Sequence, residues 1–183
     1  MDVATTDHPD VKLYAPRVFE DDRGYFYETY TQNKLEPHAP GLVFVQDNES
    51  YSKERYTVRG LHYQAPPFAQ DKLVRVLRGR IFDVVVDVRR GSPRFGQWVG
   101  VELSAADRRQ LLAPKGFLHG FATLEADCVV AYKVTAFYDK ASDGAVHWAS
   151  DDLRIDWPIP RDKAVLSAKD AAAPTFTDFQ SPF

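Results

Sequence analysis

The sequence predicts an all-β fold, a jelly-roll β-barrel with a few short peripheral helices. Short apolar runs such as Ile81–Val88 and Cys128–Val134 recur along the chain and are broken by Gly, Pro and Asp, which is the pattern of strands joined by turns. Aromatic residues, which favour strands, make up 13% of the chain. Helical periodicity is weak. These observations favour an antiparallel sandwich or barrel.

The individual elements follow from the same pattern. Strands are expected, in chain order, at 72–77, 81–88, 97–103, 111–113 and 128–134. The runs 81–88 and 128–134 are apolar on both faces and should be central strands. Residues 31–36 predict one or two helical turns, which Pro37 ends. After Ser150 we expect loops and short helices.

Length and composition limit the class of protein. A chain of 183 residues suits one domain, so we expect residues 1–183 to form a single jelly roll. The net charge is -3 and there is no basic block, which argues against nucleic acid as a partner. No apolar stretch has the length of a membrane span, and the N-terminus lacks signal-peptide features, so we expect a cytoplasmic protein. The single cysteine, Cys128, is expected to be a buried reduced thiol.

Two of the five histidines lie in dense polar and glycine-rich segments. His62 lies within 59–64 and His119 within 114–121, whereas His8 and His38 lie in polar or proline-rich surroundings and are expected to be exposed. Spacing alone leaves His62 open to two interpretations, a hydrogen-bonded structural histidine or a functional one. Lys72 is likewise either a solvated strand end or a functional cation.

The segment 114–121 raises the question of a metal site. In cupin barrels, a Pro-x-Gly-x-x-His element supplies one metal-ligating histidine, and a His-x-His pair with a nearby Glu supplies the others. Here His62 is followed by Tyr63 and Gln64, so the ligand set is incomplete. We therefore expect a cupin-like barrel without a metal and without a cofactor. A metal-dependent cupin oxygenase remains the alternative.

Three further segments are ambiguous by themselves. Strand alternation places Tyr132 and Lys133 on opposite faces, and Tyr132 is either a core aromatic or a functional phenol. Tyr138 lies near the strand end, where it is either a stacking or an exposed aromatic. Residues 19–28 predict a turn between strands with solvated charges, and residues 45–52 predict a loop or a strand edge.

Taken together, these segments resemble the dTDP-4-dehydrorhamnose 3,5-epimerase family, from about Val18 to Asp170. Each segment alone is weak evidence, but the ordered set is specific. The segments are Arg23-Gly24 with Glu28, Gln46-Asp47-Asn48, Arg59-Gly60-Leu61-His62-Tyr63-Gln64, Lys72-Leu73-Val74-Arg75-Val76, Phe82-Asp83-Val84, Ser92-Pro93 with Phe95-Gly96, Gly116-Phe117-Leu118-His119-Gly120-Phe121, Tyr132-Lys133 and Leu166-Ser167-Ala168-Lys169-Asp170.

The resemblance implies a dTDP-4-keto-6-deoxy sugar as substrate, epimerised at C3 and C5. It implies that His62 is the general base, oriented by Asp170, that Tyr132 is the acid on the opposite face of the sugar, and that Lys72 is the cation beside the keto oxygen. The further contacts that it implies with the nucleotide sugar are Arg23, Phe26, Glu28, Gln46, Asn48, Arg59, His119, Tyr138, Asp143 and Lys169.

The same resemblance implies a homodimer with strand exchange. Tyr138 and Phe26 would flank the thymine, with Phe26 from the same chain or from the partner subunit, and Arg59 would contact the diphosphate. Three residues depart from the family pattern. Phe137 replaces a frequent tyrosine, Asp143 replaces a common glutamate, and Asp71 precedes Lys72, where it could temper the charge of the lysine.

The chemistry of epimerisation suits these residue types. A proton beside a ketone is acidic only because its loss gives an enolate, which an ammonium such as Lys72 stabilises. Inversion returns the proton from the other face, so a base and an acid must lie on opposite sides of the ring, here His62 and Tyr132. Inversion at C3 or C5 alone, a ketoisomerase and a non-catalytic nucleotide-sugar binding module remain alternatives.

Overall fold

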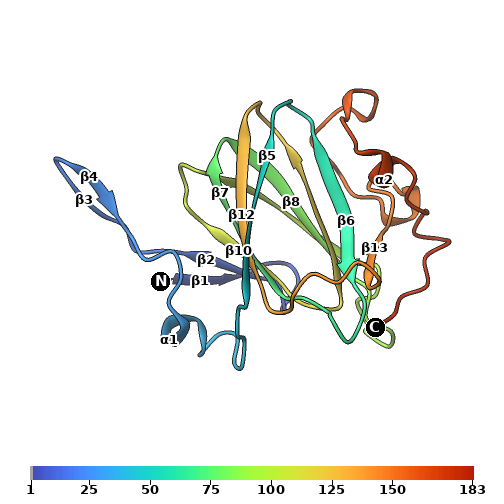
Figure 1. Cartoon of the computed structure of the whole chain (residues 1–183), viewed down its shortest axis with the longest axis horizontal. Coiled ribbons are helices and arrows are strands. Elements are labelled where there is room, and N and C mark those ends of the chain that lie inside the picture. Colours follow the sequence, from blue (N-terminus) through green and yellow to red (C-terminus); the bar gives the residue numbers. More distant parts are fainter. Residues whose placement is uncertain (1) are drawn as a thin grey trace.

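The computed structural model describes residues 2–183 and consists mainly of two antiparallel sheets packed face to face (Figure 1). The first sheet has six strands in the order β1-β2-β10-β7-β12-β5, and the second has five in the order β13-β6-β11-β8-β9. A separate ribbon, β3-β4, projects away from both sheets. The predicted all-β class is confirmed.

The strands are bounded as follows: β1 Asp2–Thr5, β2 Lys12–Ala15, β3 Phe19–Asp21, β4 Gly24–Phe26, β5 Gln46–Ser52, β6 Val58–Gln64, β7 Lys72–Arg78, β8 Arg80–Asp87, β9 Trp98–Ser104, β10 Gln110–Ala113, β11 Phe117–Thr123, β12 Cys128–Val134 and β13 Asp143–Ala145. The five strands expected from apolar runs are all present. The polar run that predicted a loop or a strand edge is β5, which forms the edge of the six-stranded sheet.

Helical structure is short and peripheral, as the sequence predicts. Helix α1 covers Gln32–Leu35, and the tail after Ser150 carries the 3-10 turns η1 (Asp151–Leu153) and η2 (Arg161–Lys163) and helix α2 (Ala168–Ala171). Within residues 2–183, no helix has the length and apolar character needed to span a membrane.

Both strands that were expected to be central have a paired neighbour on each side, but only one of them is buried on both faces. β8 lies between β11 and β9, and β12 lies between β7 and β5. Residues 83–87 of β8 are buried without interruption, whereas Val129, Ala131 and Lys133 of β12 are partly exposed on the outer face of their sheet. The prediction that both strands are central is confirmed, although the apolar residues on the outer face of β12 remain partly exposed.

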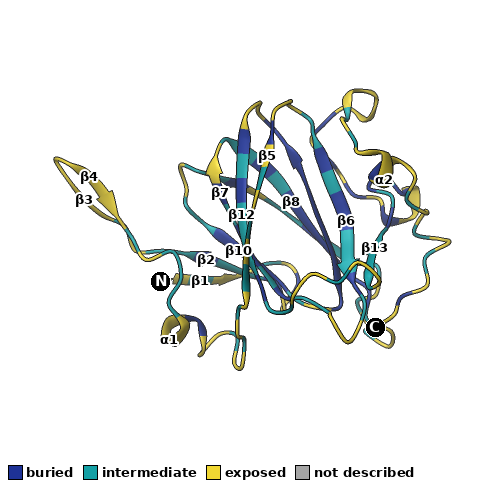
Figure 2. Ribbon diagram, viewed as in Figure 1, coloured by how far each residue is buried: buried dark blue, intermediate teal, exposed yellow. Residues whose placement is uncertain are grey.

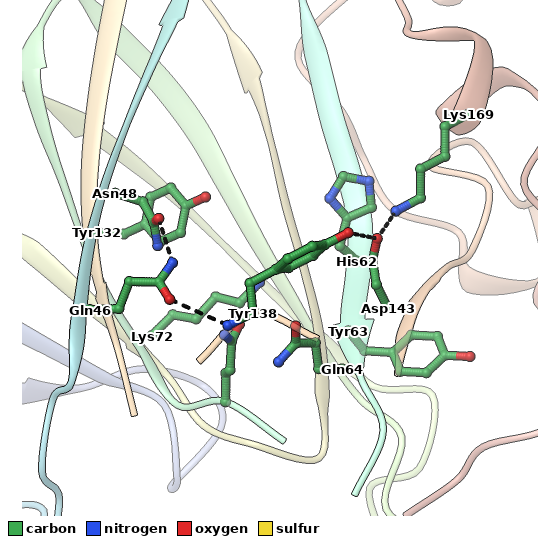
Figure 3. Close-up of a pocket in the computed structure, with 11 residues that line it drawn as sticks. Gln46, Asn48, His62, Tyr63, Gln64, Lys72, Tyr132, Tyr138, Asp143 and Lys169 are labelled. Carbon is green, nitrogen blue, oxygen red and sulfur yellow. Dashed lines mark hydrogen bonds and ion pairs between the residues drawn. The ribbon is translucent and has the colours of Figure 1, made fainter. Parts of the chain in front are cut away.

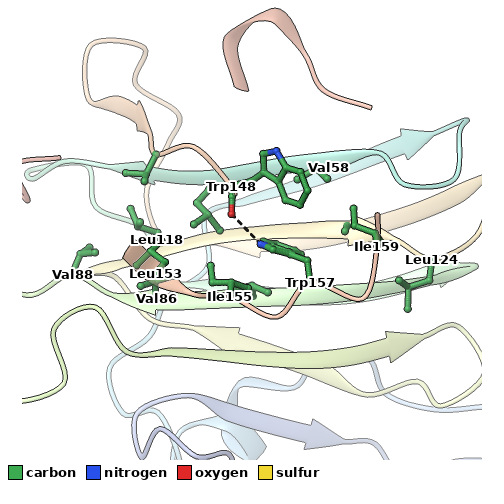
Figure 4. Close-up of a cluster of buried hydrophobic side chains, with 14 residues drawn as sticks. Val58, Val86, Val88, Leu118, Leu124, Trp148, Leu153, Ile155, Trp157 and Ile159 are labelled. Atoms are coloured by element: carbon green, nitrogen blue, oxygen red, sulfur yellow. Dashed lines mark hydrogen bonds between the residues drawn. The ribbon is translucent and has the colours of Figure 1, made fainter. Parts of the chain in front are cut away.

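The reason for this difference is the C-terminal tail, which covers only the five-stranded sheet. One buried cluster fills the space between the sheets and includes Val74, Val85 and Val130. A second cluster lies on the outer face of the five-stranded sheet, where tail residues including Trp148 and Trp157 pack against strand residues (Figure 4). The indole Nε1 of Trp157 donates to the carbonyl oxygen of Trp148 over 2.9 Å. Strands β8 and β11 are therefore enclosed on both faces (Figure 2).

The expectation that His8 is exposed is wrong. Its exposed fraction is 2%, its ring packs edge-on against Phe117, and its Nε2 lies 3.3 Å from Oδ2 of Asp87. Asp87 lies far along the sequence, at the end of β8, so the polar character of the N-terminal segment gave no indication of this contact. His38 is exposed and Cys128 is a buried free thiol, as expected.

Strands β6 and β11, which carry His62 and His119, approach each other closely at two glycines. Gly60 has a φ of +118°, and a Cβ built there would lie 2.7 Å from Cα of Gly120 and 2.8 Å from the carbonyl oxygen of His119. Only glycine fits such a position, because an added methyl group would meet rigid backbone atoms. Farther along the pair, His62 and His119 are directly opposite each other.

We predict that Gly60→Ala destabilises the protein more than Gly24→Ala does. Both residues have positive φ, which costs roughly 1–3 kcal/mol for an alanine, but a Cβ at Gly24 meets nothing within 4 Å. The clash at Gly60 should add about 1–3 kcal/mol. Urea unfolding of the two variants measures the difference, and equal losses would contradict the close approach.

Candidate active site

A polar cleft opens between the two sheets and has two connected lobes. One lobe has a volume of about 270 Å³ and the other about 230 Å³. Four residues line both lobes and mark where they meet: His62, Lys72, Tyr132 and Lys169. The two facing sheets therefore enclose a polar space beside the buried cluster that lies between them.

His62 and Tyr132 face this cleft from opposite sheets. His62 lies on β6 of the five-stranded sheet, and Tyr132 lies on β12 of the six-stranded sheet. Figure 3 shows the two side chains on opposite sides of the cavity, with Lys72 of β7 extending between them. Strand alternation explains the inward direction of Tyr132, because Val130 and Val134, two residues away on either side, are buried in the core.

His62 forms a hydrogen-bonded pair with a carboxylate from the C-terminal tail. Its Nε2 lies 2.5 Å from Oδ1 of Asp170. The other oxygen, Oδ2, accepts a hydrogen bond of 2.8 Å from the hydroxyl of Ser167, which caps α2 by accepting from the backbone N–H of Asp170 over 3.1 Å. The sequence Ser-x-x-Asp thus places the carboxylate in the first turn of α2 and fixes both of its oxygens.

The environment of Asp170 keeps it ionised. Burial by itself would raise the pKa of this carboxyl, but the hydrogen bond and charge of His62 and the hydroxyl of Ser167 outweigh burial and hold the pKa below its ordinary value. An ionised Asp170 accepts the proton of Nε2, so Nδ1 of a neutral His62 carries the free lone pair. This arrangement supplies an oriented base.

Lys72 is a cation with a strongly perturbed affinity for its proton. Desolvation lowers its pKa to about 8, while the charges of Asp83 and Asp143 oppose the decrease and that of Lys169 adds to it. Asp71, which could temper this charge according to the sequence, is not among the charges that act on this pKa. The carboxylate of Asp71 accepts hydrogen bonds from the backbone N–H of Lys115 and the hydroxyl of Thr135, each over 3.1 Å.

Tyr132 keeps its proton in the resting site. Burial raises the pKa of its phenol above the ordinary value, and the charge of Arg59 offsets only part of that increase. Such a phenol is neutral at physiological pH and can give its proton only to a strongly basic acceptor. An enolate at the junction of the two lobes would be such an acceptor.

The larger lobe is bordered by a chain of polar side chains (Figure 3). Gln46 donates to Oδ1 of Asn48 over 2.8 Å, and its own carbonyl accepts from the backbone N–H of Tyr138 over 3.3 Å. The phenol of Tyr138 lies 3.3 Å from Oδ2 of Asp143, which also pairs with Lys169. Asp143, the shorter replacement for a common glutamate, therefore still takes part in the wall of the cavity.

The second lobe contains a cation and a buried histidine–carboxylate pair. Arg59 donates to the hydroxyl of Ser52 over 3.1 Å and to the carbonyl of Tyr51 over 2.8 Å. His119 Nε2 lies 2.9 and 3.1 Å from the two carboxylate oxygens of Asp83, which has no exposed surface. The lobe thus combines a guanidinium with an oriented imidazole, groups suited to binding an anion.

The cleft brings together most of the residues that the sequence singled out. They are Gln46, Asn48, Arg59, His62, Lys72, His119, Tyr132, Tyr138, Asp143, Lys169 and Asp170. Three others lie elsewhere in this chain, on or beside the projecting β3-β4 ribbon (Figure 1). Arg23 pairs with Asp21, Glu28 pairs with Lys34, and Phe26 is 67% exposed.

Several residues of the site were not singled out from the sequence. Tyr63, Gln64 and Gln70 line the larger lobe, and Ser167 supports Asp170. Asp83 was noted only as part of a resembling segment. A carboxylate inside the otherwise apolar run 81–88 was a usable signal, because a buried charge requires a partner. The two glutamines gave no comparable signal.

No cluster of three or more His, Cys, Asp or Glu side chains in the described chain, residues 2–183, is arranged to ligate a metal ion. The two histidines of the cleft instead direct their Nε2 atoms to Asp170 and Asp83.

Comparison with known proteins identifies the family. The model of the dTDP-4-dehydrorhamnose 3,5-epimerase family matches residues 5–178. The chain belongs to this family. The dTDP-4-dehydrorhamnose 3,5-epimerase of Salmonella typhimurium is 49% identical over 95% of this chain and 94% of its own length. Solved structures of several epimerases of this family are similar to this chain in sequence and in fold, including one from Legionella pneumophila and one from Bacillus anthracis.

The first is the dTDP-6-deoxy-D-glucose-3,5-epimerase of Legionella pneumophila in complex with dTDP-4-keto-L-rhamnose. It has a TM-score of 0.93 and 43% identity, and the match covers 98% of this chain and 94% of that one. The second is the dTDP-4-dehydrorhamnose 3,5-epimerase of Bacillus anthracis with TDP and PPi bound. It has a TM-score of 0.91 and 48% identity, with coverage of 95% and 98%. The cupin-like barrel and the membership of an epimerase family are confirmed.

We predict that Asp83→Asn lowers the pKa of Lys72 below about 8, because the negative charge of Asp83 favours the ammonium form. An NMR titration of the lysine side chains measures this pKa directly. Asp71→Asn is the matched control and should leave the titration unchanged. If Lys72 titrated identically in the wild type and in Asp83→Asn, the electrostatic coupling would be refuted.

Proposed function

We propose that this protein epimerises dTDP-4-dehydro-6-deoxy-D-glucose at C3 and C5 to give dTDP-4-dehydro-L-rhamnose. The observation that carries this proposal is the placement of His62 and Tyr132 on opposite walls of one cavity, with Lys72 between them. Epimerisation needs a base, an acid on the other face and a charge for the oxyanion, and these three groups meet at the junction of the lobes.

The first half of each inversion is proton removal. The imidazole of His62 takes the proton from a carbon beside the ketone, and the electron pair of that C–H bond moves into an enolate whose oxygen faces the ammonium of Lys72. Asp170 stabilises the imidazolium that forms. Lys72 must be charged for this step, so turnover should decline as the pH rises through the lysine pKa of about 8.

The second half is proton return from the other side. Tyr132 donates its phenolic proton to the enolate carbon on the face opposite His62, and the carbonyl re-forms. The raised pKa of Tyr132 keeps this proton in place until the enolate is present. His62 then releases its proton to solvent and Tyr132 takes one up from solvent, which restores the site. The same two steps at the second carbon complete the reaction.

The outer parts of the cleft suit the nucleotide. Arg59 provides a guanidinium for the diphosphate, and Tyr138, which is 59% exposed at the larger lobe, provides a flat surface for thymine. The complex of the Legionella pneumophila relative with a dTDP-linked keto sugar supports a ligand of this class.

We further propose that residues 1–183 act as one catalytic domain in a homodimer with strand exchange. The projecting ribbon supports this, because Tyr25 and Phe26 are exposed aromatics on it and Arg23 is an exposed cation. In such a dimer Arg23, Phe26 and Glu28 would complete the site of the partner. The free thiol of Cys128 is compatible with a reducing cytoplasm, where we place the reaction.

The decisive experiment follows deuterium from heavy water into the sugar. We expect NMR of the product to show label at both C3 and C5, because each carbon loses a proton to His62 and regains one from an exchangeable tyrosine. Label at one carbon alone would replace this proposal with single-site epimerisation, and a displaced carbonyl would indicate a ketoisomerase.

We predict that His62→Ala reduces turnover at least ~100-fold, because it removes the general base. His38→Ala, at an exposed histidine outside the cleft, is the matched control and should retain full activity. Tyr132→Phe should leave dTDP binding intact while it slows inversion. Steady-state kinetics and calorimetry measure these effects, and full turnover in His62→Ala would overturn the role of His62 as the general base.

A further inference from the structure

The segment that carries Tyr138 is an irregular connection between β12 and β13, residues 135–142. Backbone hydrogen bonds hold its two ends, since Thr135 donates to the carbonyl of Asp71 over 3.2 Å and Ala65 donates to the carbonyl of Ser142 over 2.8 Å. The centre of the segment is held in a different way.

Glutamine side chains hold four consecutive residues at that centre. Gln70 donates to the carbonyl of Ala136 over 2.8 Å, and Gln64 donates to the carbonyl of Phe137 over 3.2 Å. The carbonyl of Gln46 accepts from the N–H of Tyr138, and that of Gln64 accepts from the N–H of Asp139 over 2.8 Å. These glutamines, Gln46, Gln64 and Gln70, all line the larger lobe.

Gln64 differs from the other two glutamines because its amide forms hydrogen bonds with the backbone on both sides of Tyr138. Its Nε2 also donates to the carbonyl of Phe68 over 2.7 Å, so it joins the loop before β7 to the Tyr138 segment. These bonds use both amide donors, and the amide carbonyl accepts as well. The side chain is 5% exposed and lies two residues after His62 on β6, on the same face of the strand.

We propose that Gln64 is a positioning residue for nucleotide binding, whose amide fixes the backbone around Tyr138 and thereby sets the ring of Tyr138 at the mouth of the cavity. This inference rests on the proposed function, in which Tyr138 stacks on the thymine. Without these bonds, the centre of an irregular segment would lose its ordered position, and ligand binding would have to restore that order.

Two other roles for Gln64 make different predictions. If Gln64 only fills space, Gln64→Glu keeps the volume, and any cost of the buried charge would be independent of Tyr138. A residue that contacts the nucleotide directly would weaken binding even when Tyr138 is absent. If Gln64 acts by positioning Tyr138, Gln64→Glu weakens dTDP binding when Tyr138 is present. The same substitution has little effect when Tyr138 is absent.

The experiment measures dTDP affinity by calorimetry in the wild type, Gln64→Glu, Tyr138→Ala and the double variant. We expect Gln64→Glu to weaken binding about 10-fold, the scale of one or two lost hydrogen bonds, because a carboxylate cannot donate to the carbonyls of Phe68 and Phe137. In the Tyr138→Ala background the same change should have less than about a twofold effect.

A pH series adds a readout that a purely structural role would not affect. The carboxyl introduced by Gln64→Glu regains a donor when it is protonated. The affinity ratio between the wild type and this variant should therefore decrease toward one, without reaching it, as the pH falls through the pKa of that carboxyl, because a carboxylic acid restores one of the two donors. Gln70→Ala removes a single tether and should give a smaller loss with the same dependence on Tyr138, and it provides the test if Gln64→Glu does not fold.

The outcomes separate the two proposals. Equal dTDP affinity in the wild type and Gln64→Glu, or an undiminished effect in the Tyr138→Ala background, would overturn the role of Gln64 and leave the proposed function standing. A wild type that does not bind dTDP would overturn both.

Discussion

The structure depends on pairing the buried carboxylates that line the cleft between the two sheets. Asp83 has no exposed surface and meets His119, and Asp170 is 4% exposed and meets His62 and Ser167. An unpaired charge in such a place would be far more costly than these pairs are, which is why the carboxylates and histidines occur together. Lys72 is the exception, because only more distant charges compensate its desolvation. Desolvation outweighs these charges, and the pKa of Lys72 is therefore lowered.

The C-terminal tail covers one sheet and also supplies residues to the cleft. Its aromatic and aliphatic residues cover the outer face of the five-stranded sheet, with Trp148 and Trp157 in the centre of that cluster. The same packing brings α2 to the end of the cleft, where Ser167 orients Asp170 and Lys169 pairs with Asp143. The packing of the tail on the five-stranded sheet therefore also places Asp170 beside His62. If the tail detached from the sheet, His62 would lose this carboxylate.

The proposed proton-transfer groups and the proposed nucleotide contact lie on different kinds of structure, paired strands in one case and an irregular segment in the other. The proposed proton-transfer groups His62 and Tyr132 and the cation Lys72 lie on strands that are paired on both sides, which suits chemistry that needs fixed distances. The proposed nucleotide contact Tyr138 lies on an irregular segment held by glutamine side chains.

The sequence by itself determined the strand class, the positions of five strands and the family, because apolar runs and ordered motifs are local properties of the chain. It also indicated most of the cleft, including His62 and Tyr132. Tertiary structure alone decided that His8 is buried against Asp87, that Asp83 supports His119, and that Arg23 lies on a projecting ribbon. Each of these three features depends on which distant segments pack together. Local patterns of polarity do not indicate which residues become partners.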